Sequence, residues 1–225
     1  MANPKSLRTP QAVLTRLGLL ALYVITAKIG LSLAVVHPSA TAVWAPSGIA
    51  LAALLMLGYR VAVVIFLAAF LTNVTTYGSM VSSVGIAFGN TCEAALGAYL
   101  VNRFAHGRIV FDRLPDIPRF VLFAGILGPA VGATIGVTSL TLEGYVPSNA
   151  HHSIWWTWWL GDGTGNLIVA PLFLLFSKND VVLADFRRRG IEGVLLVVSI
   201  VVTGFLVFGD LLPSKTQSYP LTYLC

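Results

Sequence analysis

Charged residues are scarce in this sequence: Asp, Glu, Lys and Arg make up only 10% of its 225 residues. A soluble domain carries about a quarter of such residues, so most of this surface does not face water. Hydrophobic residues make up 56% of the chain and fall in long runs without alternation, which excludes an outer-membrane barrel. Helices that span a bilayer remain, because they satisfy their own backbone hydrogen bonds in lipid. We therefore predict an all-α fold, a polytopic transmembrane helical bundle.

Cysteine is equally sparse, and the two residues present, Cys92 and Cys225, build no disulfide framework. No phosphate-binding glycine loop, zinc-ligand spacing or nucleophile elbow occurs in the sequence. We expect no enzymatic activity in this chain, no metal and no cofactor. The adjacent histidines His151 and His152 could bind a metal or sense pH, but a solvated loop is the expected setting for them.

Seven apolar segments are predicted to span the membrane, and the second and third are short for the ~30 Å of hydrocarbon, which takes about 20 residues. The segments are Leu17–Val36, Ala40–Leu57, Val61–Tyr77, Ser82–Val101, Phe120–Leu142, Ile154–Phe176 and Ile191–Leu212. Another apolar run opens at Pro220 and reaches only Cys225, so we expect a truncated chain whose continuation is an eighth helix. The predicted division is a cytoplasmic N-terminus at 1–16 and a membrane-embedded domain at 17–225.

The positive charges predict the orientation. If the N-terminus is cytoplasmic, twelve of the fourteen Lys and Arg residues lie on the inside, as the positive-inside rule requires. The net charge of +5 therefore reflects topology and does not indicate a nucleic-acid partner. The loop Arg103–Arg119 and the triplet Arg187–Arg189 are expected to contact anionic membrane lipid. We predict a multi-pass protein of the bacterial inner membrane.

Charged residues also occur inside the apolar segments. Lys28 in the first segment and Glu93 in the fourth are both expected near the middle of the bilayer, where one charge costs roughly 2.5–3.5 kcal/mol. An ion pair between them, or a neutral Glu93, would relieve this cost. The alternative to a functional role is a buried pair that only fixes the helix register.

Glycines recur at four-residue spacing around Glu93 and again in the fifth segment, and Asn90 lies one turn from Glu93 on the same side. Small residues at this spacing let two helix backbones approach closely, so we predict that these glycines are packing positions. They are Gly85, Gly89, Gly97, Gly128, Gly132 and Gly136.

The sixth segment opens with four tryptophans and continues into a glycine-rich stretch that carries Asp162 and Asn166. Trp158 and Trp159 lie one turn before the acid. Most of these tryptophans are explained by an interfacial aromatic belt, but Asp162 lies deeper. An acid flanked by glycines indicates the wall of a ligand pocket or a hydrated break in the helix, and a polar contact between helices is the alternative.

The second segment contains a matching irregularity at Trp44, Pro46 and Ser47. Proline does not continue a helix from preceding residues but suits a first turn. A half-helix that starts here would direct free N–H groups into the membrane, which is tolerated only beside protein or a cavity. We therefore predict one pocket, open to the outside, between this segment and Asp162.

These motifs resemble the first family of membrane-associated sensor domains (MASE type), over about Leu17–Cys225. The resemblance lies in Trp44-x-Pro-Ser-Gly-Ile-Ala leading to Leu57-Gly-Tyr-Arg, in Gly89-Asn-Thr-x-Glu-Ala, and in Trp159-Leu-Gly-Asp-x-x-Gly ending in Ala170-Pro-Leu. It implies a helical domain, usually of eight spans, at the N-terminus of bacterial histidine kinases and diguanylate cyclases. The chain departs from the pattern because it stops before the eighth span is complete.

The resemblance implies a sensory input domain that passes a periplasmic or intramembrane stimulus to a C-terminal cytoplasmic output domain, in two-component or cyclic-di-GMP signalling. The expected partners are membrane lipid, an unidentified small-molecule or physical stimulus, the output domain and a second copy in a homodimer. A transporter of a small molecule or ion is the alternative, because intramembrane charges and broken helices also mark substrate paths.

Overall fold

The computed structural model describes residues 9–32, 43–76 and 79–177, together with Leu195. Every regular element in this part of the chain is a helix, which confirms the all-α prediction there. The chain divides into two compact units, Met1–Leu174 and Leu175–Cys225. The last predicted span, Ile191–Leu212, and the apolar run that begins at Pro220 lie outside the described residues, except for Leu195, which is helical.

Four helical stretches are long and apolar enough to cross a membrane, and two apolar stretches are shorter, so the number of seven spans is not confirmed. The long ones are α1 (Thr9–Ser32), α4 (Met80–Phe104), the run of α5 (Asp116–Phe120), η3 (Val121–Leu127) and α6 (Gly128–Leu142), and η4 (Ser148–Ala150) with α7 (His151–Phe176). The shorter ones are α2 (Ala45–Leu57) and η1 (Tyr59–Val61) with α3 (Ala62–Val74), while η2 (Gly107–Asp112) joins α4 to α5.

Several helices begin earlier than the predicted apolar spans, and α1 and α7 are two of them. α1 starts at Thr9 and not at Leu17. The prediction counted only the apolar run, but a helix is held by backbone hydrogen bonds and can extend beyond the apolar residues. α7 starts at His151, so the two histidines belong to a helix end and not to a loop. The ring of His151 contacts Thr141, with 2.9 Å between Nδ1 and Oγ1.

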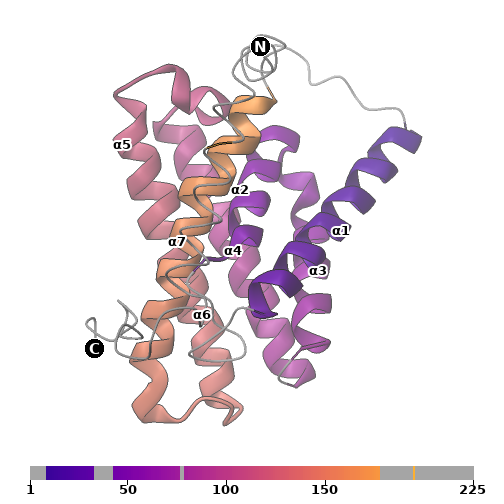
Figure 1. Cartoon of the computed structure of the whole chain (residues 1–225), viewed down its shortest axis with the longest axis vertical. Helices are drawn as coiled ribbons and strands as arrows, with labels where there is room; N and C mark the ends of the chain where they lie inside the picture. Colours follow the sequence, from indigo (N-terminus) through magenta and orange to yellow (C-terminus); the bar gives the residue numbers. More distant parts are fainter. Residues whose placement is uncertain (1–8, 33–42, 77–78, 178–194, 196–225) are drawn as a thin grey trace. The chain divides into compact units, whose positions relative to one another are not determined.

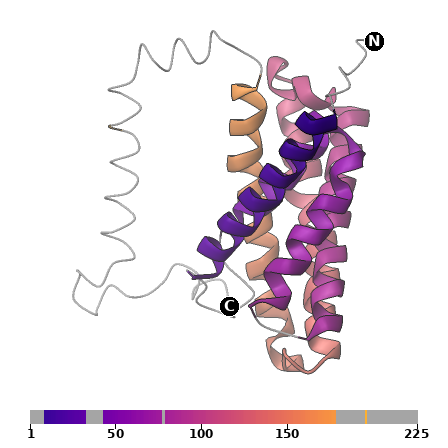
Figure 2. The same cartoon turned by 90° about the vertical axis from the view of Figure 1, so that its right-hand side faces the viewer.

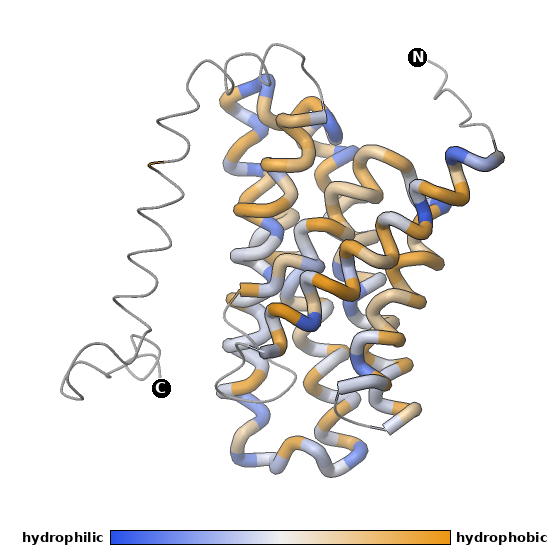
Figure 3. Tube along the Cα trace, turned by 45° about the vertical axis from the view of Figure 1, so that its right-hand side comes forward, coloured by the Kyte–Doolittle hydropathy of each residue, from blue (hydrophilic) through white to orange (hydrophobic). Residues whose placement is uncertain are grey.

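Helix α4 is the centre of the unit Met1–Leu174, where it packs against α2, α3 and α6. α1 packs against α2 and α3 and runs obliquely to the other helices (Figures 1 and 2). Hydrophobic residues extend along the helices, and hydrophilic ones gather at the ends with a few near the middle (Figure 3). Large apolar side chains such as Leu14, Val63 and Leu122 are exposed, as expected of surfaces that contact lipid.

Segment η3 is a π-helical stretch whose i→i+5 bonds include that from Gly128 N to the Phe123 carbonyl. The same pattern would pair the Ala124 carbonyl with residue 129, but Pro129 has no N–H group. The Ala124 carbonyl is therefore left free to accept a bond from another helix. π-helical turns of this kind often occur at functional sites.

Candidate functional site

Polar side chains from four helices meet inside the unit and are between 0% and 8% exposed. We call them the buried polar cluster: Tyr23 of α1, Trp44 and Ser47 at the start of α2, Asn90 and Glu93 of α4, and Asp162 and Asn166 of α7. The spacings of three residues in α4 and four in α7 place each pair on one helix face. Buried polar groups in a membrane domain are costly and mark functional positions.

Hydrogen bonds across helices connect the cluster. The Ser47 hydroxyl donates to Asp162 Oδ1 over 2.9 Å, which links the first turn of α2 to α7. The Asn166 amide donates to Glu93 Oε1 over 3.0 Å and to the free Ala124 carbonyl over 2.9 Å. One amide therefore joins α7 to α4 and to η3.

The two carboxyl groups lie beside each other. A hydrogen bond between two carboxyl groups needs a proton on one of them, because an ionised carboxylate only accepts. On the other side of the cluster the Asn90 amide donates to the Tyr23 hydroxyl over 3.2 Å, and Tyr23 interacts electrostatically with both Glu93 and Asp162. The cluster is thus one connected electrostatic unit.

The structure places the two tryptophans before Asp162 on different sides of α7. Trp158 is buried, lies beside Asp162 and packs against Gly136 of α6. Trp159 donates from its indole to the Ile126 carbonyl over 3.0 Å and stacks on Trp155, with the two rings 8° from parallel. Trp158 is therefore part of the surroundings of the cluster, and Trp159 belongs to the aromatic group at the beginning of α7.

Lys28 lies away from both acids. Its ammonium donates to the carbonyls of Thr72 and Thr75, over 3.1 and 3.0 Å, and to the Thr76 hydroxyl over 2.5 Å. Of the two alternatives considered for Glu93, the ion pair with Lys28 is not formed, because Lys28 lies in the last turns of α1 and bonds to the C-terminal end of α3. Positive charge at a helix C-terminus is favourable, because unpaired carbonyls carry the negative end of the helix dipole.

Replacing Lys28 with methionine is expected to lower the free energy of unfolding by about 1 kcal/mol, since the lost bonds are partly exposed to solvent. Unfolding of the purified protein in detergent measures the change. Lys28→Arg keeps the charge and the donors, so it should stay close to wild type. Equal stability of Lys28→Met and wild type would contradict this role.

The predicted packing glycines lie at close contacts of α4 and α6, where a methyl group would meet a neighbouring side chain or backbone atom. It would meet Ser139 at Gly85, Ile135 at Gly89, Leu51 at Gly97, the Glu93 carbonyl at Gly128, the Glu93 carboxyl at Gly132 and Trp158 at Gly136. Gly132 therefore leaves the space that the buried Glu93 carboxyl fills.

Helix α7 is continuous from His151 to Phe176, so the hydrated break, one of the alternatives considered for the sequence around Asp162, is not formed. Its glycines allow close approach instead. A methyl group on Gly165 would meet the Trp44 carbonyl, and one on Gly163 would lie 2.6 Å from the Gly125 carbonyl oxygen. The backbone N–H of Trp44 donates to the Gly161 carbonyl over 2.9 Å. The start of α2 is thus fastened directly to α7 beside Asp162.

The start of α2 follows the predicted pattern, because the helix begins at Ala45 with Pro46 in its first turn. Pro46 and Ser47 are buried beside α7, and Asp162 is 0% exposed. The predicted opening of this site to the outside stays a prediction, since the segment 33–42 that leads into α2 lies outside the described residues. In the described part of the chain no three His, Cys, Asp or Glu side chains come together as a metal site.

Two components of the site were missed from the sequence. Tyr23 looks like an ordinary aromatic residue of the first apolar segment, and only packing shows that its hydroxyl faces Asn90. The Ala124 carbonyl is a backbone group, and the available signal was Pro129, which removes its π-helical donor.

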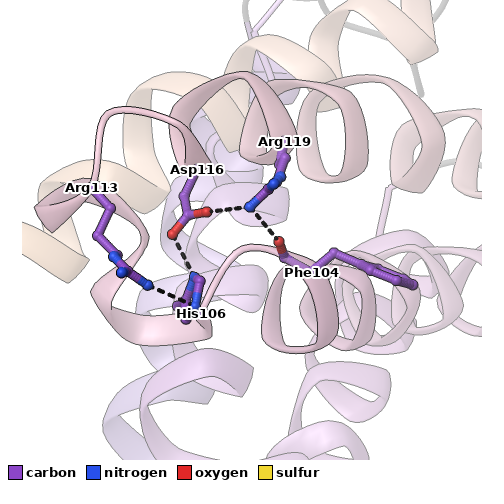
Figure 4. Close-up of polar contacts among 5 residues, drawn as sticks. All are labelled: Phe104, His106, Arg113, Asp116 and Arg119. Carbon is purple, nitrogen blue, oxygen red and sulfur yellow. Dashed lines mark hydrogen bonds and ion pairs between the residues drawn. The ribbon is translucent and has the colours of Figure 1, made fainter.

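A second polar group lies between α4 and α5 (Figure 4). The buried Asp116 carboxylate accepts from Arg119 over 2.8 Å and lies 2.6 Å from Nδ1 of His106. Arg113 donates to His106 Nε2 over 2.8 Å, and because arginine has no acceptor, His106 donates from Nδ1 to Asp116. Arg119 also donates to the Phe104 carbonyl over 3.3 Å. These contacts fix the turn between the two helices, so Arg113 and Arg119 have protein partners besides any lipid.

Comparison with known proteins gives one family. The model of MASE1, a family of membrane-associated sensor domains, matches residues 15–225. No curated protein and no solved structure matches the chain significantly. The matched region contains the complete buried polar cluster.

Proposed function

Since the chain belongs to the MASE1 family of membrane-associated sensor domains, we propose that it is the input domain of a bacterial signalling protein in the inner membrane. In this proposal its N-terminus is cytoplasmic. It receives a periplasmic or intramembrane stimulus and passes it to a C-terminal cytoplasmic output domain, a histidine kinase or a diguanylate cyclase. The chain itself catalyses no reaction.

The buried polar cluster is the observation that carries this proposal. It joins α1, α2, α4 and α7 through a few hydrogen bonds around two carboxyl groups. A signal needs a structural element with two arrangements whose balance the stimulus shifts. A change of proton, ion or ligand at these carboxyls would break the bonds of Ser47 and Asn166 and release α7 from α2 and α4.

A change in the position of α7 suits transmission, because α7 is the last helix that the structure describes before the C-terminal part of the sequence. Helix shifts of about 1–2 Å are a common way of passing a signal through packed helices. The close contact of Gly165 with the Trp44 backbone makes such a shift discrete, because tightly packed helices do not deform continuously.

The test is the output activity of the full-length protein in membranes with Glu93→Gln. We expect output to change about 5- to 150-fold, the range of ordinary allosteric coupling, while the amount of inserted protein stays the same. Glu143→Gln is the matched control, because Glu143 is an exposed acid that contacts Ser79 outside the cluster.

Wild-type output from Glu93→Gln would overturn the proposed function. A transporter would show a different result: uptake of a solute into proteoliposomes that Glu93→Gln abolishes, without any effect on an output domain.

A further inference from the structure

Four buried oxygen atoms of the cluster have no hydrogen-bond donor among the described residues. They are Asn90 Oδ1, Glu93 Oε2, Asp162 Oδ2 and Asn166 Oδ1. Roughly 90% or more of buried polar atoms in folded proteins have a partner, so four such oxygens on connected side chains need a common explanation. All four are acceptors, so the partner that they lack is electropositive, whereas the Trp44 indole N–H of the same cluster is a donor without an acceptor among the same residues.

Among the described residues, an ionised acid in the cluster would have no cationic side chain beside it. Glu93 is 1% exposed and Asp162 is 0% exposed. In the described part of the chain no Lys, Arg or His forms an ion pair with either carboxyl group, and Lys28 is held by α3. A second proton would neutralise the pair of acids, and a bound cation would also neutralise an ionised acid and take the place of the missing donors.

The ligand atoms indicate which kind of cation fits. Two carboxyl groups and two side-chain amides, with the Ser47 hydroxyl beside them, supply only oxygen, which suits a hard cation and not a thiolate- or imidazole-binding metal. When one of the two acids is protonated, the pair keeps a single negative charge. A monovalent ion brings the site to neutrality.

The surroundings favour a small ion and an ionised acid. Glu93 Oε2 lies against Gly132, where a methyl group would clash with it, so this side of the site is closely packed, which favours a small ion. The first turn of α2, with Ser47 bonded to Asp162, places the positive end of a helix dipole at this acid and stabilises its charged form. Oxygen ligands near broken helix ends also hold Na⁺ and H⁺ in membrane transporters.

We propose that the oxygen atoms of Asn90, Glu93, Asp162 and Asn166 bind a sodium ion in exchange for one proton. When both carboxyls carry a proton, the site is neutral. Entry of one Na⁺ releases one H⁺, so the charge in the membrane does not change. The inference rests on the proposed function for its meaning in the cell, where the bound ion is the ligand that the input domain senses.

The test is the melting temperature of the full-length protein in detergent, in NaCl against KCl and choline chloride at equal ionic strength. We expect NaCl alone to raise the melting temperature, because a ligand that binds only the folded state stabilises it. In acid, where the site is protonated, the apparent affinity for Na⁺ should fall about tenfold for each pH unit, as one-for-one exchange requires.

Glu93→Gln and Asp162→Asn should remove the response to NaCl, and Glu143→Gln should keep it. Equal melting temperatures in all three salts would overturn the proposal. An increase of the melting temperature in NaCl that both cluster variants retain would also overturn it. If the variants do not fold, a sodium effect in the wild type that does not depend on pH also overturns it. Failure here leaves the signalling test of Glu93→Gln unaffected, so the ligand and the function are tested separately.

Discussion

Replacing Gly165 with alanine is expected to destabilise the domain by about 3 kcal/mol, at the upper end of the usual cost of overpacking. The added methyl group would overlap the carbonyl oxygen of Trp44 and lie 2.7 Å from its carbonyl carbon. These are backbone atoms at the start of α2, and Trp44 is tied to α7 by its bond to Gly161. No flexible side chain can move aside, so the two helices must separate.

Unfolding of the purified protein in detergent measures this effect, with Gly18→Ala as the matched control. A methyl group at Gly18 of α1 meets nothing within 4 Å, and alanine is about 1 kcal/mol better than glycine inside a helix. The control should therefore be as stable as wild type or slightly more stable. Equal stability of the Gly165 and Gly18 variants would show that α2 and α7 do not pack as described.

The apolar runs predicted where most helices lie, because a long stretch with almost no charge is stable in a membrane, where a helix satisfies its backbone hydrogen bonds. Pro46 also correctly predicted a helix that starts inside the bundle, since proline is compatible with a first turn and not with a helix interior. The helix ends were less predictable. Thr9 and His151 begin helices outside the apolar runs because backbone hydrogen bonding, and not hydrophobicity, decides where a helix starts.

The candidate residues of the site were predicted mainly from the cost of placing polar groups in lipid. Ser47, Asn90, Glu93, Asp162 and Asn166 stood out for this reason, and the structure brings them together. Their role in signalling stays a prediction.

The partners within the site could not be predicted in the same way. Lys28 has a long side chain that reaches the end of a neighbouring helix, and only the packing of α1 on α3 shows this. The glycines of α7 were compatible with a break or with a close contact, and the position of α2 decides in favour of the contact.

Glu93 and Asp162 are expected to act as one unit in signalling. The two carboxyl groups lie beside each other and are bonded to Asn166 and Ser47, so a change at one acid alters the surroundings of the other. Asn166 supports the same unit from α7, where its amide holds Glu93 Oε1 and the Ala124 carbonyl. Residues in one hydrogen-bond network show coupling energies of about 0.5–3 kcal/mol, whereas distant residues act additively.

A double-mutant cycle on the output activity of the full-length protein tests this claim most directly. The variants are Glu93→Gln, Asp162→Asn and their combination, with Glu143→Gln plus Asp162→Asn as the additive control. We expect each cluster substitution to change output about 5- to 150-fold and the double variant to differ no more from wild type than the stronger single one. Effects that add fully, or wild-type output from all three variants, would contradict the account of the buried polar cluster as one sensing unit.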